Sequence, residues 1–128
     1  MPPEPMIRHL GQLSVNVKDT ARATAFYRDV LGLRFLFAAG NLAFFDLGGV
    51  RIMLSPPESP EFDHPGSILY LDVADLQAAH RELGARGVRF ESEPHVVARL
   101  ESADLWMAFF RDTEGNMLAL QSEVARAG

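Results

Sequence analysis

The sequence predicts an α+β fold in which one chain contains two copies of a βαβββ unit. Three observations predict it: a strand-like alternation changes to a helical period in residues 12–33, the same change recurs in residues 68–90, and strands punctuated by glycine follow each copy. The 128 residues suffice for one compact domain and are too few for two conventional ones. We expect the sheet faces that the helices leave uncovered to enclose a cleft, as parts of a cleft-shaped mixed β-sheet.

The first strand and helix lie in residues 12–33. Polar and apolar side chains alternate over residues 12–17, which is typical of a strand with one packed face. The polar face holds Gln12, Ser14 and Asn16. Asp19 or Thr20 can cap the helix, and an apolar stripe in residues 26–31 predicts that the helix covers the strand. Gly32 supplies the left-handed residue that ends it.

Two or three strands are predicted in residues 34–55. Gly48 and Gly49, between two apolar runs, predict a two-residue hairpin turn. This turn pairs Leu47 with Val50, Asp46 with Arg51, Phe45 with Ile52 and Phe44 with Met53. Asp46 and Arg51 would then form a cross-strand ion pair, which stabilises little when it is exposed.

The pattern restarts at Ile68. Asp75 takes the place of Asp19, Gly87 ends the second helix, and three further strands follow, with residues 112–116 as the last hairpin turn. Three prolines and three acidic residues within residues 57–66 suit an exposed linker. The predicted single domain comprises a loose arm (1–6), a first module (7–56), a linker (57–66), a second module (67–122) and a tail (123–128).

The composition limits the partners of the protein. The net charge is -5, and no run of Lys or Arg occurs, so we expect neither nucleic acid nor a membrane as a partner. No apolar run approaches the roughly 20 residues that span a bilayer, and the first ten residues lack a signal peptide's pattern, so a cytoplasmic location is expected. The absence of cysteine rules out disulfides, thiolate metal ligands and a cysteine nucleophile.

The motifs VKD, FYRDVLGL and RDTEGNMLAL together resemble the vicinal oxygen chelate superfamily. This superfamily includes glyoxalase I, bleomycin resistance proteins, fosfomycin resistance proteins and extradiol dioxygenases. The resemblance covers both modules and implies a glyoxalase/bleomycin resistance-like fold, with paired βαβββ modules around a cleft. Members of the family differ in their reactions, so the fold alone does not give the function.

The resemblance also implies four positions for metal ligands in the cleft. These positions hold Gln12, Met53, Ile68 and Ala119 in this sequence. Only Gln12 is a plausible ligand, because a divalent ion needs several imidazole or carboxylate donors. The sequence therefore predicts that the usual metal centre is absent, and we expect no cofactor. Met53, Ile68 and Ala119 would instead form an apolar cleft floor, although core filling explains them equally well.

Polar and aromatic residues on the predicted cleft face are candidates for ligand binding. The predicted ligand-binding residues are Gln12, Ser14, Asn16, Met53, Ile68, Tyr70, His95, Arg99, Trp106 and Ala119. His95 opens PHVVARLESADLW, which we interpret as an insert-like loop, with Arg99 to hold an anion and Trp106 to stack on a ligand. Alternatively, Arg99 pairs with Glu101 or Asp104 and Trp106 fills the core. The candidate bases are His95, in this segment, and His64, in the linker.

These observations favour a metal-independent protein that binds a small, partly aromatic or hydrophobic molecule in the cleft between its modules. The resemblance and the proline-rich arm predict a homodimer. The alternative is an enzyme of the same fold, of the lyase, isomerase or dioxygenase type, that uses His95 and Arg99 or a relocated metal site. A third hypothesis is a structural module with a vestigial cleft.

Overall fold

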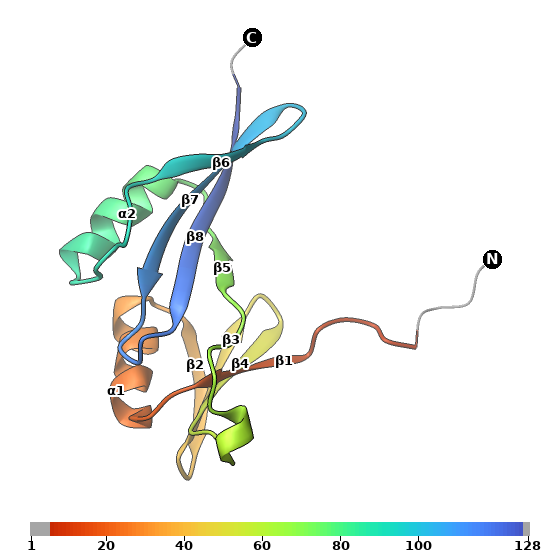
Figure 1. Ribbon diagram of the computed structural model, residues 1–128, viewed down its shortest axis with the longest axis vertical. Helices are drawn as coiled ribbons and strands as arrows, with labels where there is room; N and C mark the ends of the chain where they lie inside the picture. Colours follow the sequence, from red (N-terminus) through yellow and green to blue (C-terminus); the bar gives the residue numbers. More distant parts are fainter. Residues whose placement is uncertain (1–5, 127–128) are drawn as a thin grey trace.

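The computed structural model describes residues 6–126, which form two four-stranded sheets with the two α-helices on one side (Figure 1). The first unit consists of β1 (Gln12–Asn16), α1 (Thr20–Ala25), the π-helix η1 (Phe26–Val30), β2 (Arg34–Ala39), β3 (Leu42–Leu47) and β4 (Val50–Ser55). Its strand order is β1-β4-β3-β2, in which β1 runs parallel to β4 and the other neighbours are antiparallel. The predicted arm lies mostly outside the described residues, whereas β8 extends into the predicted tail as far as Ala125.

The second unit repeats this topology after a short 3-10 helix, η2 (Pro60–Phe62). It consists of β5 (Leu69–Asp72), α2 (Leu76–Ala85), β6 (His95–Arg99), β7 (Ala103–Arg111) and β8 (Met117–Ala125). The strand order is β5-β8-β7-β6, again with one parallel pair, β5 with β8. The α+β fold of two βαβββ units is therefore confirmed.

The local signals in the sequence act as predicted. The hairpin of β3 and β4 has the expected register, with Phe44 opposite Met53 and Asp46 opposite Arg51. Gly48 and Gly49 have positive φ angles of 60° and 92°, which the turn requires. In each unit an aspartate caps the helix: Asp19 accepts a hydrogen bond from the backbone N–H of Arg22, and Asp75 from that of Ala78.

The first helix differs from the expected regular helix. After α1 it widens into η1, where the N–H of Leu31 donates to the carbonyl oxygen of Phe26 at 3.0 Å. Tyr27 lies in this wider turn, is 1% exposed, and donates its hydroxyl hydrogen to Oδ2 of Asp112 at 2.8 Å. The π turn thus accompanies a buried hydrogen bond between the two units, which the helical period alone cannot predict.

The interpretation of PHVVARLESADLW as an insert-like loop is wrong. The segment contains β6 and the start of β7, which pair as an antiparallel hairpin with Val96 opposite Trp106 and Arg99 opposite Asp104. Valines in this run have a high strand propensity, and the pairing satisfies the backbone hydrogen bonds that a loop would leave to water.

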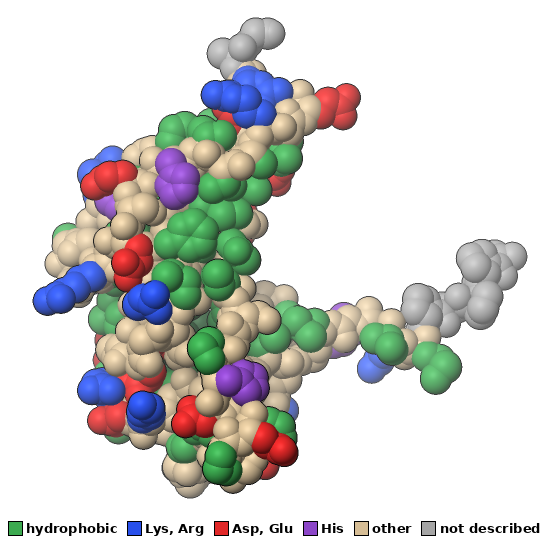
Figure 2. Space-filling view, in the orientation of Figure 1, with side chains coloured by type: hydrophobic (Ala, Val, Ile, Leu, Met, Phe, Trp, Pro, Cys, Tyr) green, Lys and Arg blue, Asp and Glu red, His purple; other side chains and the backbone are tan. Residues whose placement is uncertain are grey.

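The core lies between the helices and the sheets. Its largest fully buried side chains are those of Tyr27, Phe45, Phe110, Ile52, Leu54, Leu118 and Val17. Figure 1 shows α1 and α2 on the same side of the molecule, and Figure 2 shows the opposite side hollowed, with hydrophobic side chains on its upper wall. We call the sheet surface opposite α1 and α2 the open face. Among the described residues, no helix is long and apolar enough to span a membrane.

The turn between β7 and β8 joins the second unit to the first. Glu114 Oε1 accepts the backbone N–H groups of Lys18 and Asp19 at 2.8 and 2.9 Å. Its Oε2 pairs with Arg22 at 2.8 Å, although the Glu114 side chain is only 1% exposed. The amide of Asn116 donates to the carbonyl oxygen of Asn16 at 2.9 Å. These contacts fix the end of β1 against the start of β8.

Candidate functional site

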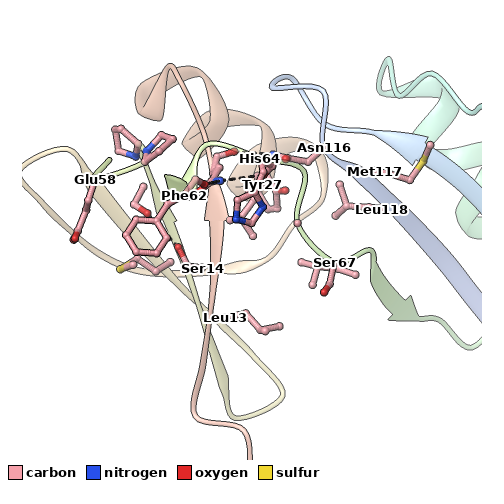
Figure 3. Close-up of a pocket in the computed structure, with 18 residues that line it drawn as sticks. Leu13, Ser14, Tyr27, Glu58, Phe62, His64, Ser67, Asn116, Met117 and Leu118 are labelled. Atoms are coloured by element: carbon pink, nitrogen blue, oxygen red, sulfur yellow. Dashed lines mark hydrogen bonds between the residues drawn. The ribbon is translucent and has the colours of Figure 1, made fainter. Parts of the chain in front are cut away.

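A pocket of about 390 Å³ lies where the two units and the linker meet (Figure 3). We call it the junction pocket. One wall comes from β1 and β4, a second from residues 56–67, and a third from residues 116–118 at the start of β8. Apolar side chains predominate, and the polar ones include Ser14, Asn16, Ser55, Glu58, His64 and Asn116. A largely apolar cavity with a few polar groups is typical of small-molecule sites.

The linker forms its wall because the end of β1 holds it. Asn16 Nδ2 donates to the carbonyl oxygens of Phe62 and His64 at 2.6 and 3.3 Å. Figure 3 shows the Phe62 and His64 side chains beside this strand. The Nδ1 atom of His64 lies 3.1 Å from the carbonyl oxygen of Pro65. Below them, the hydroxyl oxygens of Ser14 and Ser55 are 3.2 Å apart.

Two ionisable groups near the junction pocket have shifted pKa values. Burial and the negative charge of Asp112 raise the pKa of Tyr27 well above its usual value, so its hydroxyl stays protonated. Burial opposes ionisation of Glu114, but the N–H groups of Asp19 and Lys18 and the guanidinium of Arg22 outweigh it and lower this pKa to about 2. Both shifts arise from contacts between the units, so we assign these residues to the framework of the pocket.

Gln12 belongs to a cluster on the open face of the first sheet, next to the junction pocket. Its Oε1 accepts a hydrogen bond from Arg51 Nε at 2.7 Å, and its Nε2 donates to Met53 Sδ at 3.8 Å. The guanidinium carbon of Arg51 lies 5.2 Å from the centroid of the Phe44 ring. The ion pair expected between Asp46 and Arg51 is not found among the described residues, although their register is as predicted.

A second group of candidates lies on the open face of the other sheet. Tyr70 packs edge-on against Phe109, with ring centroids 6.3 Å apart, and His95 stacks on the same ring at 6.2 Å. His95 Nδ1 is 2.9 Å from the carbonyl oxygen of Glu93. Ala119 is the register partner of both Tyr70 and Phe109, and it is completely buried.

The structure brings together only some of the predicted ligand-binding residues. Ser14, Asn16 and Met53 line the junction pocket with the candidate base His64. Ile68 lines an adjoining pocket of about 490 Å³, which also includes His64. Gln12 lies beside Met53, whereas Tyr70, His95 and Ala119 lie on the second sheet. Their roles in binding stay predictions.

Arg99 and Trp106 lie apart from both pockets. Arg99 forms an ion pair with Asp104 at 3.0 Å, and its side chain is 70% exposed. Met107 is the register partner of His95 on the open face. Trp106 is the next residue along the strand, so its side chain lies on the other face of the sheet, where it packs against the core. Both positions match the alternative considered from the sequence, in which Arg99 pairs locally and Trp106 fills the core.

Sequence reasoning missed Phe62 and Arg51. Phe62 is an aromatic residue in an otherwise polar linker, two positions before His64, and this isolated apolar residue was the available signal. Arg51 was expected to pair with Asp46, because register alone cannot distinguish a partner on β3 from one on β1.

The residues present do not fit the metal centre that the family resemblance implies. The four positions hold an amide, a thioether and two hydrocarbon side chains, from Gln12, Met53, Ile68 and Ala119. In the described part of the chain, no three His, Cys, Asp or Glu residues lie close enough to hold a metal ion. A divalent ion would therefore lack the charged or imidazole donors that it requires.

Comparisons with known proteins agree with this architecture. The family model described as Glyoxalase/Bleomycin resistance protein/Dioxygenase superfamily matches residues 9–120. Among curated proteins, "Metallothiol transferase FosB" of Staphylococcus haemolyticus is 34% identical over 50 residues, which is 39% of this chain. The matched region spans only 36% of the length of that relative.

Solved structures match over nearly the whole chain. A member of the Glyoxalase/bleomycin resistance protein/dioxygenase superfamily from Sphaerobacter thermophilus has a TM-score of 0.78 and 23% identity, with 93% of this chain and 100% of that chain covered. TnmS3, an antibiotic binding protein from Streptomyces sp. CB03234, has a TM-score of 0.74 and 25% identity. The match covers 94% of this chain and 99% of TnmS3.

Proposed function

Since the chain belongs to the Glyoxalase/Bleomycin resistance protein/Dioxygenase superfamily, we propose that it binds a small, partly aromatic or hydrophobic molecule in the junction pocket without using a metal. The superfamily includes enzymes as well as binding proteins, so the proposal depends on the site and not on the fold.

The observation that carries the proposal is the contact between Gln12 and Met53. They occupy two of the four positions at which the family resemblance expects metal ligands, and they contact each other through an amide and a thioether. Both polar atoms of the Gln12 side chain are already engaged, one by Met53 and the other by Arg51. An amide and a thioether that contact each other suit the edge of a binding pocket better than they suit the coordination of a divalent metal ion.

The size and lining of the junction pocket support a small organic ligand. A volume of about 390 Å³ falls in the range of roughly 300–1,000 Å³ that holds drug-sized molecules. Phe62 and Met53 offer an aromatic face and a polarisable thioether, and the Ser14 hydroxyl and the side-chain oxygen of Asn116 offer hydrogen-bonding groups. The antibiotic-binding function of TnmS3, which has the same fold, also supports this class of ligand.

Fluorescence titration with phenylnaphthylamine, an uncharged aromatic probe, tests the proposal. Met53→Trp fills the junction pocket and should abolish the binding of the probe. Met107→Trp is the matched change on the second sheet, outside the pocket, and should leave the affinity unchanged. Equal loss in both variants, or no binding by the wild type, would overturn the proposal.

Catalysis is the second candidate, and the position of His64 favours it. His64 lines both pockets, whereas His95 and Arg99 line neither. A base at this place could remove a proton from a bound molecule. If the protein turns over any small molecule that binds in the pocket, His64→Ala should abolish turnover, and His9→Ala, outside both pockets, should not. Turnover that survives His64→Ala would exclude this mechanism.

We further propose a homodimer. Met6, Ile7 and Leu10 are 96%, 87% and 56% exposed, and every residue of β2 is exposed. A second copy could cover these apolar surfaces, which are costly to leave in water. Light scattering at micromolar concentration should give twice the mass of the chain, and a monomeric mass would contradict the dimer. The cytoplasmic location stays a prediction from composition.

A further inference from the structure

Arg51 is held in a defined orientation without a carboxylate partner. Among the described residues, six arginines form ion pairs with acidic side chains. Arg51 forms none, but a hydrogen bond to Gln12 and the ring of Phe44 fix its guanidinium. In the same part of the chain, Arg8, Arg34, Arg81 and Arg89 also lack an acidic partner, and their side chains show no comparable contact. Arg51 therefore differs from a freely moving surface arginine.

The aromatic support beneath Arg51 is itself well packed. Phe44 is only 8% exposed although it lies on the open face, and its ring stacks on Phe37 with centroids 4.5 Å apart and planes 25° apart. A cation above such a ring is stabilised by the electron density of the ring face. The Nε hydrogen of Arg51 is used by Gln12, and no described residue accepts from the terminal nitrogens. These nitrogens can donate two parallel hydrogen bonds to two oxygens of one anionic group.

This arrangement adjoins the junction pocket. Met53 follows Arg51 by two positions on β4, so the two side chains project from the same face about 7 Å apart along the strand. Met53 lines the pocket and also contacts Gln12, which holds Arg51. A molecule with its aromatic part in the pocket could therefore place an acidic group on Arg51.

The surrounding charges make such a site selective. The chain has a net charge of -5, which disfavours anions in general. On the open face, Asp46 lies in register between Arg34 and Arg51, so this row carries one more positive than negative charge. Glu58 lines the pocket at its linker side. Arg51 is the arginine of this row whose guanidinium is held in place, by Gln12 and Phe44, beside the junction pocket.

We propose that Arg51, oriented by Gln12 and Phe44, is the anion-binding subsite of the junction pocket, and that the ligand is an aromatic acid carrying a carboxylate or sulfonate. This inference rests on the proposed binding function and adds the charge class of the ligand. Gln12 is the positioning residue: it contacts Arg51 and leaves the terminal nitrogens to the ligand.

Two matched probes test the inference. Anilinonaphthalene sulfonate and phenylnaphthylamine have the same aromatic body and differ in the sulfonate. Arg51→Gln should weaken binding of the sulfonate about tenfold or more, because a charge-assisted hydrogen bond is lost, and should change binding of the uncharged probe less than about twofold. Arg89→Gln, which removes an exposed charge away from both pockets, should change neither affinity.

The outcomes separate this inference from the function on which it rests. If Arg51→Gln weakens both probes equally or affects neither, the anion subsite is wrong while pocket binding stands. If the wild-type protein binds neither probe, the proposed function itself fails, and the subsite with it. An Arg89→Gln variant that loses sulfonate binding as strongly as Arg51→Gln would show an effect of net charge only, and would also overturn the subsite.

Discussion

The side-chain amide of Gln12 donates to the sulfur of Met53 at 3.8 Å, across the parallel pair of β1 and β4. The family resemblance implies metal ligands at both positions, yet here one residue is an amide and the other a thioether, and neither is charged. Met53 lines the junction pocket and Gln12 lies beside it, so in the proposed function the site binds through hydrogen bonds, aromatic surface and Arg51.

Gln12→Ala should have little effect on folding. Gln12 is exposed, and its hydrogen bonds are made at the surface, so we expect the free energy of unfolding to change by less than about 1 kcal/mol. Urea denaturation measures this change. In the same variant, sulfonate binding should weaken, because Arg51 loses its positioning contact. A severe loss of stability would mean that Gln12 serves the fold.

Tyr27→Phe should destabilise the protein by about 1–2 kcal/mol. The buried hydroxyl donates to Asp112, and its removal takes one of the hydrogen-bond donors from a buried carboxylate. Thermal or urea denaturation measures the difference. Tyr70→Phe is the matched control, because this tyrosine is 47% exposed and should cost almost nothing. Equal effects of the two changes would contradict the role of the Tyr27 hydroxyl in joining the units.

Glu114 should make the stability depend on pH in the acid range. Its pKa is about 2 in the folded protein against an ordinary 4.5, so its ionised form stabilises the fold fully above pH 4.5. As the pH falls from 4.5 towards 2, we expect a loss of roughly 3 kcal/mol, since each pKa unit corresponds to about 1.4 kcal/mol.

Urea denaturation at several pH values tests this dependence. Glu114→Gln should be less stable than the wild type at pH 7, and the difference should shrink as the pH falls towards 2. Glu58→Gln is the control, because Glu58 is exposed and makes no ion pair with another described residue. A Glu114→Gln variant with the wild-type pH dependence would show that another carboxylate is responsible.

Gly49→Ala should destabilise the hairpin of β3 and β4 by about 1–2 kcal/mol. Gly49 has a φ angle of 92°, which a residue with a Cβ atom adopts only under strain. Gly66→Ala is the control, since Gly66 has no such φ angle and a Cβ there would meet no atom within 4 Å. Thermal denaturation should show a lowered midpoint for Gly49→Ala only. Similar midpoints for both variants would contradict the backbone argument.

The sequence predicted those parts of the fold that local chemistry specifies. Gly48 and Gly49 require positive φ angles and so set the register of the hairpin, and Asp19 and Asp75 cap the helices through their own neighbouring N–H groups. None of these features depends on the rest of the chain, which explains why the sequence pattern suffices to predict them.

The site depends on contacts between segments that are distant in sequence. Asn16 donates hydrogen bonds to the carbonyl oxygens of Phe62 and His64, and these bonds hold the linker against β1. Phe62 lines the pocket because the linker is held there. Arg51 had possible partners on both neighbouring strands, and the three-dimensional distances favoured Gln12 over Asp46. Trp106 was predicted to contact a ligand because the hairpin that contains it was interpreted as a loop. In a strand, the alternation of side chains places Trp106 on the face opposite His95.

Metal-independent binding is the central claim, and one titration tests it most directly. The affinity of the purified protein for phenylnaphthylamine is measured before and after exhaustive treatment with a chelator, and again after a divalent metal is returned. Because the four expected ligand positions offer a single neutral donor, we predict that the dissociation constant stays within about twofold throughout. Binding that disappears with the chelator and returns with the metal would contradict the claim.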